Sequence, residues 1–197
     1  MFKNKYNIII WSFLATLILV LALSTFDQDN IANVAFAQFD KETTSVIQLL
    51  KSGDSDGAIR NATEYLKANP NNVNILNSLA EAYKMKDDAV NFEKYAKRAI
   101  EIEPNNPWSC KLLSQVYRTK TENKDSEQRR NENLTLAAEA VERGLTSNPN
   151  DILLLAEKAQ IYFERGAIST ALQAINQALK IAPDDAYLKE LKEKIMK

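Results

Sequence analysis

Few side chains in this sequence could support covalent or metal chemistry. The 197 residues include no histidine and a single cysteine, Cys110. These counts exclude histidine-based triads, histidine–metal sites and a disulfide within the chain. Glu101 and Glu103 are close in sequence, but side chains two positions apart on a helix diverge. Because no glycine-rich phosphate loop and no nucleophile with a suitable base is visible, we expect no catalysis, no cofactor and no small-molecule substrate.

The composition favours an all-helical protein that does not bind nucleic acid. Glycine occurs only four times, whereas alanine, leucine, lysine and glutamate are abundant. The net charge is −1, and sequence-independent binding of nucleic acid needs a strong basic excess. The elements that would position any functional surface must therefore be helices.

Those helices are punctuated at regular intervals. Prolines that close an apolar helical end recur at spacings of 34, 45 and 34 residues, at Pro70, Pro104, Pro149 and Pro183. Proline cannot continue a helix. Each is followed by a pair of residues that can cap the next helix: Asn71-Asn72, Asn105-Asn106, Asn150-Asp151 and Asp184-Asp185.

Between these signals, apolar residues recur at three- and four-residue steps. One stripe holds Leu76, Leu79, Ala80 and Tyr83, and a second holds Phe92, Tyr95, Ala96, Ala99 and Ile100. Neither helix can bury its stripe alone, so the helices must pair and the pairs must stack. Cys110 occupies the core position that matches Leu76, and we expect it to pack there as a small hydrophobe.

This pattern resembles the tetratricopeptide repeat. The stretch Val73–Asn106 carries its signature as Leu79, Ala80, Tyr83, Ala99 and Pro104, and Ile152–Asp185 carries it as Ala159, Tyr162, Gly166, Ala171, Ala178 and Pro183. Phe39–Asn72 supplies Gly53, Ala58 and Pro70. The resemblance implies an all-α, right-handed superhelical solenoid. The apolar run near the amino end adds a hydrophobic N-terminal helix before it.

The repeats are expected at residues 39–72, 73–106, 107–151 and 152–185, followed by a capping helix over 186–197. The cap would present Tyr187, Leu188, Leu191 and Ile195 on one face. The third repeat contains an insertion at about 121–131 and its closing helix is expected to resume at Ala137. The insertion is interpreted as a solvated loop or polar helical turns, with a contact arm as the alternative.

Residues 1–38 are predicted to be a signal anchor or signal peptide with a linker. Lys3 and Lys5 precede an uncharged run of 21 residues, Tyr6–Phe26, which would span about 31 Å as a helix. This order places the repeats outside the cytoplasm. The length of the run favours a retained membrane anchor, and cleavage at Ala37–Gln38, with release of the repeats, is the alternative.

By resemblance, the first helix of each repeat lines a concave groove that binds protein or peptide. The positions implied to face this groove are Asn74, Asn77, Glu81, Lys84, Trp108, Lys111, Gln115, Arg118, Leu153, Ala156, Gln160 and Phe163. Trp108 is either a groove contact or a packing residue at a repeat junction. Lys111 with Gln115 only partly matches the Lys/Asn clamp that some relatives use for a terminal carboxylate.

Two functions remain open. The first is an extracytoplasmic scaffold or adaptor that binds a protein or peptide in the groove. The second is a structural or assembly subunit of an envelope complex that interacts through its convex face or the insertion. Asn133 and, less favourably, Asn61 match the N-glycosylation pattern.

Overall fold

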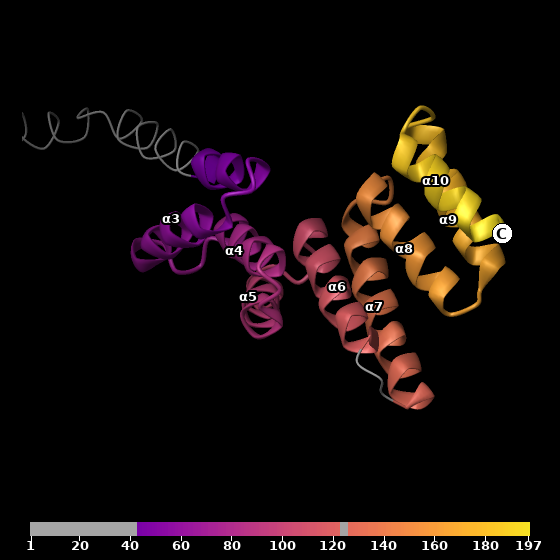
Figure 1. Cartoon of the computed structure of the whole chain (residues 1–197), viewed down its shortest axis with the longest axis horizontal. Helices are drawn as coiled ribbons and strands as arrows, with labels where there is room; N and C mark the ends of the chain where they lie inside the picture. The colour runs from indigo at the N-terminus through magenta and orange to yellow at the C-terminus, as the bar shows by residue number, and fades with distance from the viewer. Residues whose placement is uncertain (1–42, 123–125) are drawn as a thin grey trace, which may run out of the picture. The chain divides into compact units, whose positions relative to one another are not determined.

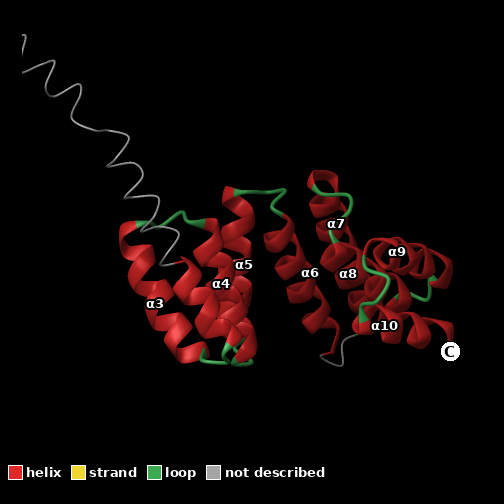
Figure 2. Ribbon diagram, turned by 90° about the horizontal axis from the view of Figure 1, so that it is seen from above, coloured by secondary structure: helices red, strands yellow, loops and turns green. Residues whose placement is uncertain are grey.

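The computed structural model describes residues 43–122 and 126–197, and within these ranges the chain forms nine helices and no strand (Figure 1, Figure 2). Ser45–Lys197 form one compact unit, distinct from Met1–Thr44. In chain order the helices are one over 43–51, then α3 (Ser55–Ala68), α4 (Val73–Met85), α5 (Ala89–Ile102), α6 (Pro107–Glu122), α7 (Glu127–Ser147), α8 (Ile152–Glu164), α9 (Ile168–Ile181) and α10 (Ala186–Met196).

The expected membrane run, Tyr6–Phe26, and the cleavage site at Ala37–Gln38 lie outside the described residues. In the part of the chain that is described, no helix combines the length and the apolar character that crossing a bilayer requires.

The predicted caps open their helices as expected. In each of the four Asn/Asp pairs, the second residue accepts a hydrogen bond from the backbone N–H three positions on, at 3.0–3.1 Å. These acceptors are Asn72, Asn106, Asp151 and Asp185. The bond satisfies one of the N–H groups that a helix start leaves free.

Helices pack in the order that a stack of hairpins requires. Each helix from α3 onward contacts the next, and the first helices of successive repeats also touch, as α4 with α6 and α6 with α8. One buried cluster joins the second and third repeats through Ala80, Phe92, Ala96, Leu112 and Val116. The rings of Tyr83 and Tyr95 stack within the second repeat, with centroids 5.5 Å apart and planes 2° from parallel. The predicted stripes therefore form the core.

The turn between the two helices of a repeat uses the same backbone conformation three times. Gly53 and Gly166 have φ of 82° and 75°, and the equivalent residue of the second repeat, Asp87, has φ of 56°. Glycine adopts this left-handed region without a steric cost, whereas a residue with a Cβ is strained there.

The insertion in the third repeat is mostly helix. Helix α6 continues to Glu122 and α7 already begins at Glu127, so the expectation that the closing helix resumes at Ala137 was wrong. Ser126 caps the earlier start, and no proline or glycine interrupts the stretch. Residues 126–132 are exposed, and Leu134 is the first buried side chain. These exposed turns agree with the interpretation of the insertion as polar helical turns.

Helix α7 approaches α6 and α8 closely at a glycine. A Cβ added to Gly144 would lie 2.8 Å from the Cβ of Cys110 and 2.8 Å from Cδ1 of Leu154. Cys110 is fully buried in this core, as predicted. The glycine therefore sets the spacing of the three helices.

The last helix covers the end of the stack. Helix α10 contacts α9 and α8 and buries Leu188, Leu191 and Ile195. Tyr187 differs from the prediction, because 55% of it remains exposed.

Candidate functional site: a groove on the first helices

A cavity of about 500 Å³ lies on the first helices of the four repeats. We call it the groove cavity. The helix over 43–51, α4, α6 and the start of α8 all contribute lining residues, namely Ile47, Leu50, Lys51, Glu81, Met85, Pro107, Trp108, Lys111, Asp151, Leu153 and Leu154. Of the residues that the sequence assigned to a groove, Glu81, Trp108, Lys111 and Leu153 meet in this cavity. Its apolar wall is not closed, because 44% of Met85 and 60% of Leu153 remain exposed.

Trp108 belongs both to the groove cavity and to a repeat junction. The side chain is half-buried. It packs against the buried cluster that joins the second and third repeats, while it also lines the cavity. The two alternatives stated for this residue are therefore compatible, since packing holds the indole in place and leaves part of it accessible.

A ladder of polar side chains runs beside the cavity from α4 to α8. Lys84 Nζ forms an ion pair with Glu81 at 2.7 Å and donates to Gln115 Oε1 at 3.0 Å. The Gln115 amide in turn donates to Glu157 Oε2 at 3.5 Å. Gln115 therefore has both ends of its amide engaged within the protein.

Arg118 ends this ladder as a bridge between α6 and α8. Its guanidinium pairs with Glu157 at 2.9 Å and with Glu164 at 2.6 Å, and only 18% of its side chain is exposed. Burial alone lowers the pKa of Arg118, but the hydrogen bonds and attraction of the two carboxylates outweigh this effect and raise the pKa above its ordinary value. Its charge is therefore engaged by two carboxylates of the fourth repeat.

The other expected groove residues lie in different environments. Asn77 is completely buried and accepts a hydrogen bond from Ser109 Oγ at 2.9 Å. Asn74 is exposed, Gln160 is half-buried, and Ala156 is buried. Phe163 is half-buried, with the Lys194 ammonium 6.0 Å from its ring centroid. None of these five residues is among those that line the groove cavity.

Two buried polar atoms on α4 have no hydrogen-bond partner in the part of the chain that the structure describes. They are Nδ2 of Asn77, a donor, and Oε2 of Glu81, an acceptor. The two residues are four positions apart on α4, so they share a face. A buried polar group without a partner costs about 1–3 kcal/mol.

Several lining residues were not assigned to the groove from the sequence. The first repeat contributes Ile47, Leu50 and Lys51, and α4 adds Met85. Applying the family's groove offsets to the first repeat as well would have found Ile47 and Leu50. The sequence around Glu157 does not indicate its ion pair with Arg118, because the two residues are 39 positions apart.

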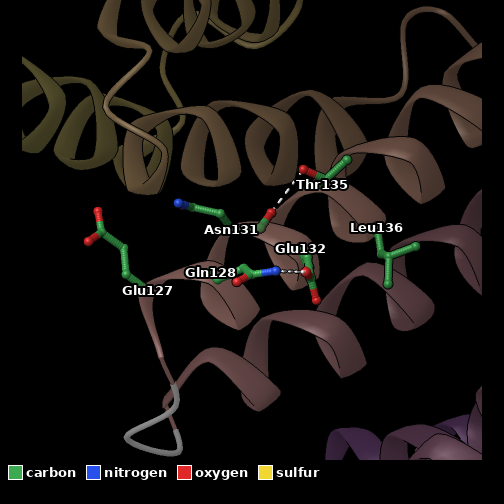
Figure 3. Close-up of a pocket in the computed structure, with 6 residues that line it drawn as sticks. All are labelled: Glu127, Gln128, Asn131, Glu132, Thr135 and Leu136. Carbon is green, nitrogen blue, oxygen red and sulfur yellow. Dashed lines mark hydrogen bonds between the residues drawn. The ribbon is translucent and has the colours of Figure 1, made fainter.

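A second concave surface follows the outer face of α7 (Figure 3). All six of its described lining residues, Glu127, Gln128, Asn131, Glu132, Thr135 and Leu136, come from this one helix. Gln128 donates to Glu132 at 3.1 Å, and Thr135 Oγ1 donates to the Asn131 carbonyl at 2.9 Å. These bonds are local helical contacts, and no second element faces them among the described lining residues.

The two possible glycosylation sites both lie on helices. Asn61 is exposed on α3, and Asn133 is half-buried on α7. Their modification stays a prediction.

Comparisons with known proteins agree with the fold. Residues 46–107 and 128–195 each match a family model described as tetratricopeptide repeat. No curated protein matches the chain.

Solved structures share the arrangement of helices at low sequence identity. A thermophilic TPR protein of Thermus thermophilus is 19% identical, with a TM-score of 0.72 over 79% of this chain and 80% of that one. MamA from Desulfovibrio magneticus RS-1 is 13% identical, with a TM-score of 0.58 over 80% and 88%. A tetratricopeptide repeat protein from Parabacteroides merdae ATCC 43184 is 16% identical, with a TM-score of 0.61 over 78% and 56%. From stacked hairpins, the shared signature and both family matches, we conclude that this chain carries tetratricopeptide repeats, which generally serve as protein-interaction scaffolds.

Proposed function

We propose that this protein is a non-catalytic scaffold that binds a protein or peptide in the groove cavity. The observation that carries the proposal is the open apolar wall, where Leu153 and Met85 stay exposed beside Trp108. Apolar residues clustered in a concave surface are typical of a binding site, because a ligand removes them from water.

The test compares two groove variants with a matched control on full-length protein. Trp108→Ala and Leu153→Ser change the groove cavity, whereas Ile181→Ser changes an apolar residue of similar kind on α9, where 43% of it is exposed. Proteins captured from an extract by each variant are quantified by mass spectrometry. We expect the same specific partner to be lost from both groove variants and kept by the control. Equal capture by all variants would remove the groove from the proposal.

We further propose that the repeats work on the extracytoplasmic side of a membrane, held there by Tyr6–Phe26 or released after cleavage at Ala37–Gln38. The support is the charge order around the apolar run in the sequence. Two measurements test this: the N-terminal sequence of the mature protein, and protease protection of the repeats in intact cells. A mature chain that starts at Gln38 would replace the anchor with release, and repeats protected with the cytoplasmic proteins would refute export.

A second candidate is assembly through the outer face. Ile102 and Ile181 occupy equivalent positions at the ends of α5 and α9, and 37% and 43% of them are exposed. An envelope subunit that packs through this face would lose its partner in the Ile181→Ser control and keep it in the two groove variants. The same experiment therefore separates the two functions.

A further inference from the structure

In the groove cavity, the acidic side chains have partners within the described part of the protein and the basic side chains do not. Each of its two carboxylates has one partner, because Glu81 pairs with Lys84 through Oε1 and Asp151 accepts a hydrogen bond from the backbone N–H of Leu154. Its two ammonium groups, on Lys51 and Lys111, form no ion pair or hydrogen bond through their side chains among the described residues. The unsatisfied charge in the cavity is therefore positive.

The helix ends strengthen this imbalance. Helix α6 starts in the cavity at Pro107 and Trp108, and its cap is the neutral Asn106. A helix start carries a partial positive charge, which a neutral cap does not cancel. The start of α8, in contrast, is capped by the charged Asp151.

The apolar residues limit what can carry the matching negative charge. Lys51 and Lys111 stand among Ile47, Leu50 and Leu153 in a cavity of about 500 Å³. A free anion would leave these apolar groups in water. A peptide that places apolar side chains beside a carboxylate satisfies both requirements at once.

A terminal carboxylate fits this site less well than a side-chain carboxylate. The clamp that relatives use for a chain terminus needs an amide beside the lysine. Gln115, the amide that follows Lys111 along α6, is already bonded to Lys84 and Glu157. The cavity therefore offers the ammonium groups of Lys51 and Lys111 to a side-chain carboxylate.

We propose that the ligand of the groove cavity is an extended apolar peptide segment with an internal Asp or Glu, whose carboxylate is bound by Lys51 and Lys111. This inference rests on the proposed groove function and adds the chemistry of the partner. Charge-assisted hydrogen bonds of this kind are stronger than neutral ones and weaken with added salt.

The experiment selects peptides from a randomised phage-displayed library on the full-length protein. An enriched peptide is then synthesised in its original form, with its acidic residue replaced by the matching amide, and with a free or amidated C-terminus. We expect enriched peptides to combine apolar residues with Asp or Glu. The amide form should bind about tenfold more weakly, as loss of a hydrogen bond to a charged group implies, and amidation of the C-terminus should have no effect.

Lysine variants provide the matched comparison. Lys51→Gln and Lys111→Gln should weaken binding of the acidic peptide and leave binding of its amide form unchanged. The control, Lys180→Gln, removes the same charge from an exposed position on α9, outside the cavity, and should change the binding of neither peptide. Binding that ignores Lys51 and Lys111, or a requirement for the free C-terminus, would overturn the proposal.

The outcomes also separate this inference from the proposed function. If neutral peptides are enriched and lose binding to Trp108→Ala, the groove function holds and the acidic partner is wrong. If no enriched peptide depends on Trp108, both proposals fail.

Discussion

Arg118 of the third repeat donates a hydrogen bond to Glu157 of the fourth at 2.9 Å, and only 7% of the Glu157 side chain is exposed. The same guanidinium reaches Glu164. This pairing connects the first helices of two repeats, α6 and α8. The residue that the family pattern places in the groove therefore acts first as a cross-link between repeats.

Removing this cross-link should destabilise the fold. We expect Arg118→Ala to lower the free energy of unfolding by about 3 kcal/mol, because it leaves the buried Glu157 carboxylate without its charged partner. Glu157→Ala should cost less, about 2 kcal/mol, since Arg118 keeps Glu164. Urea denaturation of both variants measures the difference. Wild-type stability in Arg118→Ala would show that the pair contributes nothing.

Enlarging Gly144 should also destabilise the stack. A methyl group at this position meets the Cβ of Cys110 at 2.8 Å, and that atom is fixed by the backbone of α6. We expect Gly144→Ala to lower stability by about 1–3 kcal/mol, the usual cost of overpacking. Adding Cys110→Ala should not rescue it, because alanine keeps the Cβ. Glu139→Ala, on an exposed position of α7, is the control and should change the denaturation midpoint little.

A substitution in the turn at Asp87 should stabilise the protein. Its φ of 56° is the conformation that glycine adopts in the equivalent turns of the first and fourth repeats. We expect Asp87→Gly to raise stability by about 0.5 kcal/mol, because relief of backbone strain outweighs the added freedom of the unfolded chain. Gly166→Ala should lower it by about 1 kcal/mol. Thermal melts of the two variants should shift in opposite directions, and a shared direction would contradict this explanation.

Glu93 links stability to pH. Partial burial alone raises its pKa, but hydrogen bonds from Lys120 and Lys97 outweigh burial and hold the pKa of Glu93 below its ordinary value of 4.5. A carboxyl whose pKa is lowered on folding stabilises the protein above its unfolded pKa, and this contribution is lost as the pH falls through the folded pKa. Glu93→Gln should therefore be less stable than wild type at neutral pH, by less than about 1 kcal/mol.

The difference between Glu93→Gln and wild type should shrink as the pH falls below 4.5, the ordinary value for this carboxyl. Melting temperatures measured across this range check the trend. Glu139→Gln, which changes an exposed glutamate, provides the reference. A difference that stays constant with pH would assign the effect of Glu93 to packing.

The insertion in the third repeat should be dispensable for folding. Residues 126–132 are exposed, and the first buried side chain after them is Leu134. Deleting Thr121–Asn131 removes mostly solvated turns and should leave the melting temperature almost unchanged, as expected for surface changes away from the core. Failure of the shortened chain to fold would assign these turns a structural role.

The turns between successive repeats could be predicted because their signals are local. Pro104 ends one helix and Asn106 caps the next, so a few neighbouring residues decide where the turn lies. The apolar stripes were equally readable, since the burial of Leu76, Leu79 and Ala80 follows from their spacing.

Other features depend on residues far apart in sequence. Nothing near Arg118 indicates that Glu157 will neutralise it, so the groove offsets of the family place it at a binding surface. Helix α7 begins before its apolar stripe, where a polar stretch reads equally well as loop or helix, and the cap on Ser126 decides between them. The cavity itself combines side chains from four repeats, and no single repeat contains its shape.

Cys110 is the one sulfhydryl in the sequence, and it is fully buried between α6 and α7. Burial also raises the pKa of this thiol above its ordinary value, although Arg143 opposes the effect. Only a transient separation of the two helices can expose a reactive thiolate to a labelling reagent. The rate at which a reagent modifies Cys110 therefore reports how often α6 and α7 separate, and no engineered probe is needed.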